Sequence, residues 1–152
     1  MNLNIAIPKG AYGIWHVPSL NIQLPVYFKS NSTRQQIIDR KESALIDPWV
    51  NAYRIADHVC STGLNGKGIW NMQQIMVGSE AYLTKDDGTY QYECYMTAIA
   101  DVQSYGYTVG GRLLTPLSSL DILNACCVGL DSKRNYVAVF RCKRKLKAST
   151  VK

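Results

Sequence analysis

The sequence predicts a mostly β fold, a mostly antiparallel and closed or nearly closed β architecture with one or two helices. Apolar and polar residues alternate along several short segments, which is the pattern of strands with one buried face. Turn-forming residues separate these segments at short intervals, as they do in antiparallel sheets. Near-helical spacing is confined to two brief stretches. These observations together favour an all-β architecture over a helical bundle.

The chain opens with an extended region over residues 14–28, which are rich in β-branched and aromatic side chains. Prolines within it restrict the region to an edge or bulged strand. A helix is expected next, because Ser32 or Thr33 can cap its start and Pro48 ends it. The residues that follow near-helical spacing are Ile37, Ile38, Lys41 and Leu45. Residues 49–59 fit either a helix or a buried strand, and we favour a strand at their end.

A glycine-rich loop over residues 61–68 leads into a short helical turn predicted over 69–77. The clearest signal follows, where Asp86-Asp87-Gly88 separates two segments and predicts a β-hairpin. Those segments are residues 80–84 and 89–98. Two further strands are predicted, at residues 120–127 and 135–141, with the loop Gly-Leu-Asp-Ser-Lys-Arg between them.

Size and charge favour one domain, assigned to residues 1–145, with a basic tail at 146–152. The chain has 152 residues and a formal net charge of +6. Residues 133–152 contain eight Lys or Arg and no acid, so we interpret the excess as a solvated chain end, and nucleic-acid binding is not favoured. Apolar runs are far shorter than the roughly 20 residues that span a bilayer, so no transmembrane segment is expected.

The number of cysteines and the N-terminal residues indicate in which cellular compartment the chain is expected. Five cysteines, at positions 60, 94, 126, 127 and 142, form an odd set, so at least one thiol remains unpaired. The N-terminus lacks the basic start and apolar stretch of a secretory signal. A reducing compartment or a reactive thiol is therefore expected. A cytoplasmic location follows if the chain is full length.

A small set of residues can carry nucleophilic chemistry. The chain has two histidines; His16 lies in an apolar opening strand, whereas His58 ends an apolar run and opens onto the glycine-rich loop. Cys126 and Cys127 end the run Asp-Ile-Leu-Asn-Ala-Cys-Cys, and Arg134 lies beyond the next loop. A thiolate needs a proton carrier for the leaving group and a donor for the developing oxyanion. Imidazole and guanidinium groups supply these two roles.

Several segments together resemble the sortase family of cysteine transpeptidases. Ile-Leu-Asn-Ala-Cys-Cys, followed by a loop, Arg134 and a strand, resembles the signature Thr-Leu-x-Thr-Cys with its later arginine. The opening PSLNIQLPVY, the segment RIADH and the hairpin EAYLTKDDGTYQYEC occur in the family's order. The match covers roughly residues 18–140, so the resemblance implies a divergent member with a sortase-like closed β-barrel of about eight strands and one or two short helices.

The resemblance assigns roles residue by residue. Cys126 becomes the nucleophile because Leu123 then occupies the leucine of the signature; His58 becomes the general acid/base and Arg134 the oxyanion or carbonyl partner. Ile122 and Ala125 replace the two threonines of the signature. The implied reaction cleaves a peptide sorting motif through a thioacyl-enzyme and transfers it to an amine, with no cofactor. A trimmed sortase domain would belong at the cell surface.

Two other interpretations remain open. A zinc site formed by His58, Cys60 and the cysteine pair is disfavoured, because adjacent cysteines rarely bind one tetrahedral ion and no Cys-x-x-Cys occurs. A catalytically silent sortase-fold binding module remains the main alternative, binding nucleic acid or an anionic surface through its basic C-terminus. On this interpretation Cys60, Cys94 and Cys142 act as small buried apolar residues, as they do in the enzyme.

Overall fold

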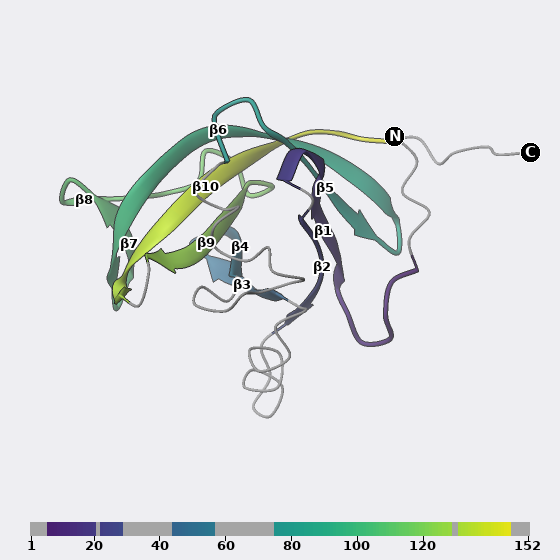
Figure 1. Ribbon diagram of the computed structural model, residues 1–152, viewed down its shortest axis with the longest axis horizontal. Helices are drawn as coiled ribbons and strands as arrows, with labels where there is room; N and C mark the ends of the chain where they lie inside the picture. Colours follow the sequence, from purple (N-terminus) through teal and green to yellow (C-terminus); the bar gives the residue numbers. More distant parts are fainter. Residues whose placement is uncertain (1–5, 21, 29–43, 57–74, 129–130, 147–152) are drawn as a thin grey trace, which may run out of the picture.

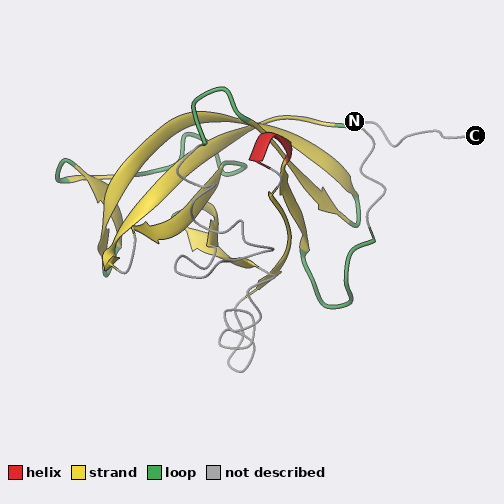
Figure 2. Cartoon of the chain, viewed as in Figure 1, coloured by secondary structure: helices red, strands yellow, loops and turns green. Residues whose placement is uncertain are grey.

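A computed structural model describes residues 6–20, 22–28, 44–56, 75–128 and 131–146 (Figure 1). Within these residues the chain is mostly strand, with connecting loops and a single 3-10 turn (Figure 2). The first elements are β1 (Gly13–Val17), η1 (Pro18–Leu20), β2 (Ile22–Phe28), β3 (Ala44–Trp49) and β4 (Ala52–Ala56). They are followed by β5 (Glu80–Lys85), β6 (Gly88–Gln103), β7 (Gly106–Val109), β8 (Arg112–Leu113), β9 (Ile122–Val128) and β10 (Asp131–Lys145).

The strands close into a barrel. The sheet order is β10-β9-β4-β3-β2-β1-β5-β6-β7-β8, and a further pairing of β10 with β6 joins the two ends of the first eight strands. Pairs β2–β3 and β4–β9 are parallel, and the other described pairs are antiparallel. The predicted closed barrel of about eight strands is therefore confirmed. The long strands β6 and β10 arch side by side across the molecule, and the β7–β8 hairpin projects beyond them (Figure 1).

The predicted hairpin forms as β5 and β6. Lys85 pairs with Gly88, so Asp86 and Asp87 form the two-residue loop. Gly88 has φ +133, a conformation that side chains rarely adopt, and an added Cβ would lie 2.8 Å from Lys145 Cε. The positive φ of the turn favours glycine here, whereas the flexible Lys145 side chain could move aside.

The helix predicted up to Pro48 is wrong in its last part, because residues 44–49 form β3. Ala44 and Ile46 are buried in the core, and β3 pairs with β2 and β4, so tertiary packing outweighs the local helical spacing. Within residues 49–59, β4 forms a strand over Ala52–Ala56, whereas residues 57–59, the end for which a strand was favoured, lie outside the described residues. The start of the helix and residues 57–74, which include the glycine-rich loop and most of the predicted turn at 69–77, lie outside the described residues.

Two hydrophobic clusters lie on opposite faces of the β9–β10 part of the sheet. The inner cluster fills the barrel with residues from all eight closing strands, including Trp15, Ile55, Cys126 and Phe140. The outer cluster joins Leu123, Ala125, Val137 and Val139 to residues of β6 and β7 and to the end of β3 and the start of β4. Alternate residues of β9 and β10 thus belong to different cores, as the two-residue period of a strand requires.

The basic residues near the C-terminus lie mostly on a paired strand rather than on a frayed tail. Strand β10 carries six of the eight, since it runs from Asp131 to Lys145. Arg141 Nε donates to Glu93 Oε1 at 3.0 Å and Arg144 Nε donates to Gln91 Oε1 at 2.9 Å, both across to β6. Within the described residues, the structure contains no helix long and apolar enough to cross a membrane.

Candidate functional site

The site is organised by the parallel pair β4 and β9, which run side by side and end at the same edge of the sheet. Their register runs from Tyr53 opposite Ile122 to Ala56 opposite Ala125. Cys126 follows Ala125 directly. His58 comes two residues after Ala56 in sequence and lies outside the described residues. The fold therefore brings the end of β4 next to the cysteine pair, although the two segments are about 70 positions apart in the chain.

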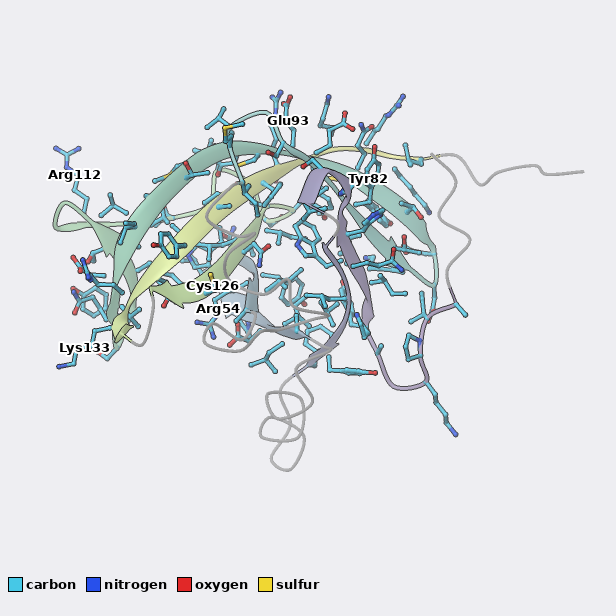
Figure 3. The ribbon with its side chains drawn as sticks, in the orientation of Figure 1. Arg54, Tyr82, Glu93, Arg112, Cys126 and Lys133 are labelled. Carbon is cyan, nitrogen blue, oxygen red and sulfur yellow. The ribbon has the colours of Figure 1, made fainter. Side chains whose placement is uncertain are left out.

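Cys126 lies within β9 and faces the barrel interior. Its register partner on β10 is Tyr136, and its side chain is only 2% exposed. It belongs to the inner cluster with Trp15 and Phe140. Figure 3 shows it in the central part of the molecule, on the strand next to the one that carries Arg54. In this conformation the sulfur is covered, so a peptide reaches it only after its surroundings move.

Arg134 lies near the start of β10 and is exposed. Its register partner on β6 is Asp101. Arg134 is two residues before Tyr136, so the side chains of Arg134 and Tyr136 are on the same face of β10. Because Tyr136 is opposite Cys126, that face is also the face of Cys126. A pocket of about 210 Å³ lies on this side, and Tyr136, Ala138, Thr97 and Ile99 contribute to its lining. The structure thus places two of the three predicted residues on one face of the sheet.

Asn124 fixes the strand next to Cys126, and the sequence analysis missed it. Its Oδ1 accepts a hydrogen bond from Trp15 Nε1 at 3.0 Å, and its Nδ2 donates to the Ile55 carbonyl oxygen at 3.0 Å. The amide is 2% exposed, so both bonds are made in the core, where an unpaired polar group is costly. The one available signal is a lone amide in an otherwise apolar strand.

A second polar cluster lies on the outer face, and it too was missed. Arg54 Nε donates to Asp47 Oδ1 at 2.8 Å, and its Nη2 donates to Asp47 Oδ2, so the pair is bidentate. Arg54 Nη1 donates to the Tyr107 hydroxyl at 2.8 Å, and Asn135 Nδ2 donates to the same oxygen at 2.9 Å. This Asp47–Arg54–Tyr107–Asn135 cluster links β3, β4, β7 and β10. An arginine inside an apolar strand was the signal for it.

The charge of Arg54 is secured by its partners. Burial acts to lower the pKa of Arg54, but the hydrogen bonds and charge of Asp47, with a contribution from Tyr107, raise it above its ordinary value. The guanidinium therefore stays charged and is largely neutralised by Asp47. Its role is consequently that of an anchor for Tyr107 rather than of an open anion-binding group.

The remaining candidates behave as packing residues. Burial raises the pKa of the Cys94 and Cys142 thiols, which makes both poor nucleophiles at neutral pH. Cys94 is buried as predicted, Cys142 is partly buried, and Cys60 lies outside the described residues. His16 is partly buried on β1, and burial lowers its pKa. No group of three His, Cys, Asp or Glu among the described residues is arranged to bind a metal ion.

Comparison with solved structures identifies the architecture. Listeria monocytogenes sortase A superposes with a TM-score of 0.65 at 20% identity, covering 91% of this chain and 92% of that one. Streptococcus agalactiae sortase C1 gives a TM-score of 0.69 at 10% identity, covering 94% and 74%. Corynebacterium diphtheriae sortase A, a lid mutant, gives 0.65 at 14% identity, covering 95% and 75%.

Sequence comparisons add no nearer relative. No family model matches the chain, and no curated protein matches it. At these identities the structural likeness establishes the fold, and the predicted sortase-like barrel is confirmed.

Proposed function

Starting from the premise that this chain has the sortase fold, we propose that it is a sortase-like cysteine transpeptidase. The observation that carries the proposal is the parallel β4–β9 pair, in which Ala56, two residues before His58 in the sequence, lies opposite Ala125, the residue before Cys126. Arg134 begins the strand that pairs with β9. A thiol, an imidazole and a guanidinium from distant segments are the three groups that this acyl transfer needs.

The proposed reaction has two halves. A thiolate of the cysteine pair attacks the carbonyl carbon of a peptide sorting motif, a C–S bond forms, and the scissile C–N bond breaks as His58 protonates the leaving amine. An acceptor amine then attacks the thioester and releases the thiol. Arg134 holds the carbonyl oxygen while it carries negative charge. The sequence assigns the attack to Cys126, and its burial requires the covering residues to move before reaction.

The test is mass spectrometry of the protein after incubation with a panel of Leu-Pro-containing peptides. We expect a thioester adduct that peptide mapping places on the cysteine pair, and its loss in His58→Ala and Arg134→Ala. Cys126→Ala and Cys127→Ala identify the sulfur. Cys142→Ala is the matched control, because this partly buried thiol lies elsewhere on β10 and should leave adduct formation unchanged. Absence of any adduct, together with no labelling of either cysteine by a thiol-reactive probe, contradicts the proposal.

A catalytically silent binding module is the second candidate, and the 2% exposure of Cys126 favours it. The basic residues of β10 would then supply the binding surface. Salt-dependent binding of DNA or of anionic vesicles, retained after all three site residues are replaced, distinguishes this candidate from the enzyme.

A further inference from the structure

A recess of about 440 Å³ opens on the outer face of β6 and β10. Its lining comes from the segment before β5, the turn before β9, and the paired strands themselves. Figure 3 shows Glu93, which borders the recess, on the convex side of the arch that β6 and β10 form, with Cys126 on the concave side. The lining residues include neither Cys126 nor Arg134, so the recess is separate from the candidate site.

A β-bulge shapes the floor of the recess. The register of β6 with β10 shifts between Val139 and Phe140, so β6 carries one extra residue, Tyr95. A bulge of this kind bends the strand and re-aims the side chain that it carries. The Tyr95 hydroxyl donates to Asp121 Oδ2 at 2.7 Å. The bulge therefore anchors the turn that precedes β9.

Two exposed aliphatic side chains form opposite walls, and both are held in place. Leu117 is 83% exposed, and its backbone N–H donates to Asp121 Oδ2 at 2.9 Å. Val77 is 65% exposed, and the next residue, Gly78, donates its N–H to the Cys94 carbonyl oxygen at 2.8 Å. Both walls are thus tied to the same stretch of β6. A recess with fixed apolar walls needs little ordering before it binds a partner.

The charges around the opening favour an acidic partner. Arg141 lines the recess, and its Nε donates to Glu93 Oε1 at 3.0 Å. The hydrogen bond from Arg141, together with the nearby charge of Lys143, lowers the pKa of Glu93, so two cations flank this one acid. The Asp121 carboxylate is 2% exposed, and its hydrogen bonds lie within the protein. The accessible charge at the opening is therefore positive on balance, as it is for the whole chain at +6.

We propose that this recess is a docking site for an extended acidic segment of a partner protein, which inserts one bulky apolar side chain between Val77 and Leu117. Carboxylates beside that side chain meet Arg141 and Lys143 at the opening. Apolar side chains seated in well-formed pockets contribute most of the binding energy at protein interfaces, and complementary charges select the partner. Because the site uses none of the proposed catalytic residues, it stands or falls independently of the proposed function.

The probe for this docking site is a fluorescein-labelled peptide with one phenylalanine between two pairs of glutamates. Its binding, measured by fluorescence anisotropy at low salt, should weaken by about fivefold or more in Val77→Ser and in Leu117→Ser, because each change removes an apolar wall. Val50→Ser is the matched control, since Val50 is 60% exposed in the β3–β4 turn and does not line the recess. Thermal unfolding of all three variants should be unchanged, because the replaced side chains are exposed.

Charge and anchor are tested separately with altered peptides and with one further variant. A peptide with lysines in place of the glutamates, and one with alanine in place of phenylalanine, should each bind at least about fivefold more weakly. Arg141→Ala should weaken binding of the glutamate peptide and reduce its dependence on salt.

Three results overturn the proposal. The first is no binding of the glutamate peptide up to about 1 mM, or equal binding of the glutamate and lysine peptides. The second is unchanged binding in both Val77→Ser and Leu117→Ser. The third is another occupant: sedimentation with phosphatidylserine vesicles that Leu117→Ser abolishes assigns the surface to a membrane, and a concentration-dependent dimer that the same variant abolishes assigns it to a second copy of the chain.

Discussion

The two faces of the paired strands β9 and β10 differ in how they handle polar groups. On the inner face, Asn124 is the polar residue next to Cys126, and both ends of its amide are hydrogen-bonded. On the outer face, a charged pair, a phenol and an amide form a chain that leaves one polar atom over. The inner face is therefore organised for stability, whereas the outer face keeps a buried polar atom that can still form a hydrogen bond.

The largest expected effect is on the inner face. Phe140 is fully buried, with its ring 5.1 Å from that of Trp15 in an edge-on contact. Phe140→Ala should lower the free energy of unfolding by about 3–5 kcal/mol, because it opens a cavity in the barrel. Urea denaturation measures this, with Phe140→Leu as a milder control. A loss below about 1 kcal/mol would mean that the inner cluster does not carry the stability assigned to it.

Asn124→Leu is expected to come next. It removes two core hydrogen bonds and leaves Trp15 Nε1 and the Ile55 carbonyl without their partner, at a cost of about 1–3 kcal/mol for each buried group. Trp15→Phe removes one of the same bonds from the other side. Denaturation of the double variant should show a loss in the free energy of unfolding that differs from the sum of the two single losses. A loss equal to that sum argues against a direct coupling of the two side chains.

Tyr107→Phe should have a smaller effect on stability, about 1 kcal/mol, since the ring remains and only the hydroxyl is lost. The difference between the two faces predicts that Asn124→Leu loses more stability than Tyr107→Phe, because it leaves two buried groups without partners in the barrel core. Thermal unfolding of both variants measures the difference. A loss of stability in Tyr107→Phe as large as that in Asn124→Leu would contradict the predicted difference between the two faces.

The smallest effect is expected at the surface pair Glu93 and Arg141. The hydrogen bond from Arg141 lowers the pKa of Glu93 from its ordinary value. A lowered folded-state pKa contributes stability above the unfolded value, and this contribution is lost as the pH falls through the folded pKa. Arg141→Ala should return the Glu93 pKa toward its ordinary value, as seen by NMR titration. The change in stability near pH 7 should be barely detectable, and a large one would reveal a structural role for the pair.

Much of the fold followed from local pattern. The hairpin at Asp86-Asp87-Gly88 was predictable because the turn residues and the alternation on both sides agree. Residues 44–49 were mispredicted, since their spacing suits a helix and only pairing with β2 and β4 makes them a strand. The structure places Cys126 and Arg134 on one face of the sheet, but their catalytic roles stay predictions. His58 stays a prediction.

The sequence by itself determined that strands dominate, that the chain closes as a sortase-like barrel, and that a cysteine pair precedes an arginine-bearing strand. Tertiary structure alone decided which face each residue occupies. A shift of one position moves a side chain from one face of a strand to the other, and long-range pairing with β4 and β10 sets that position. For this reason Cys126 joins the barrel core, and Arg54, Tyr107 and Asn135 meet on the opposite side.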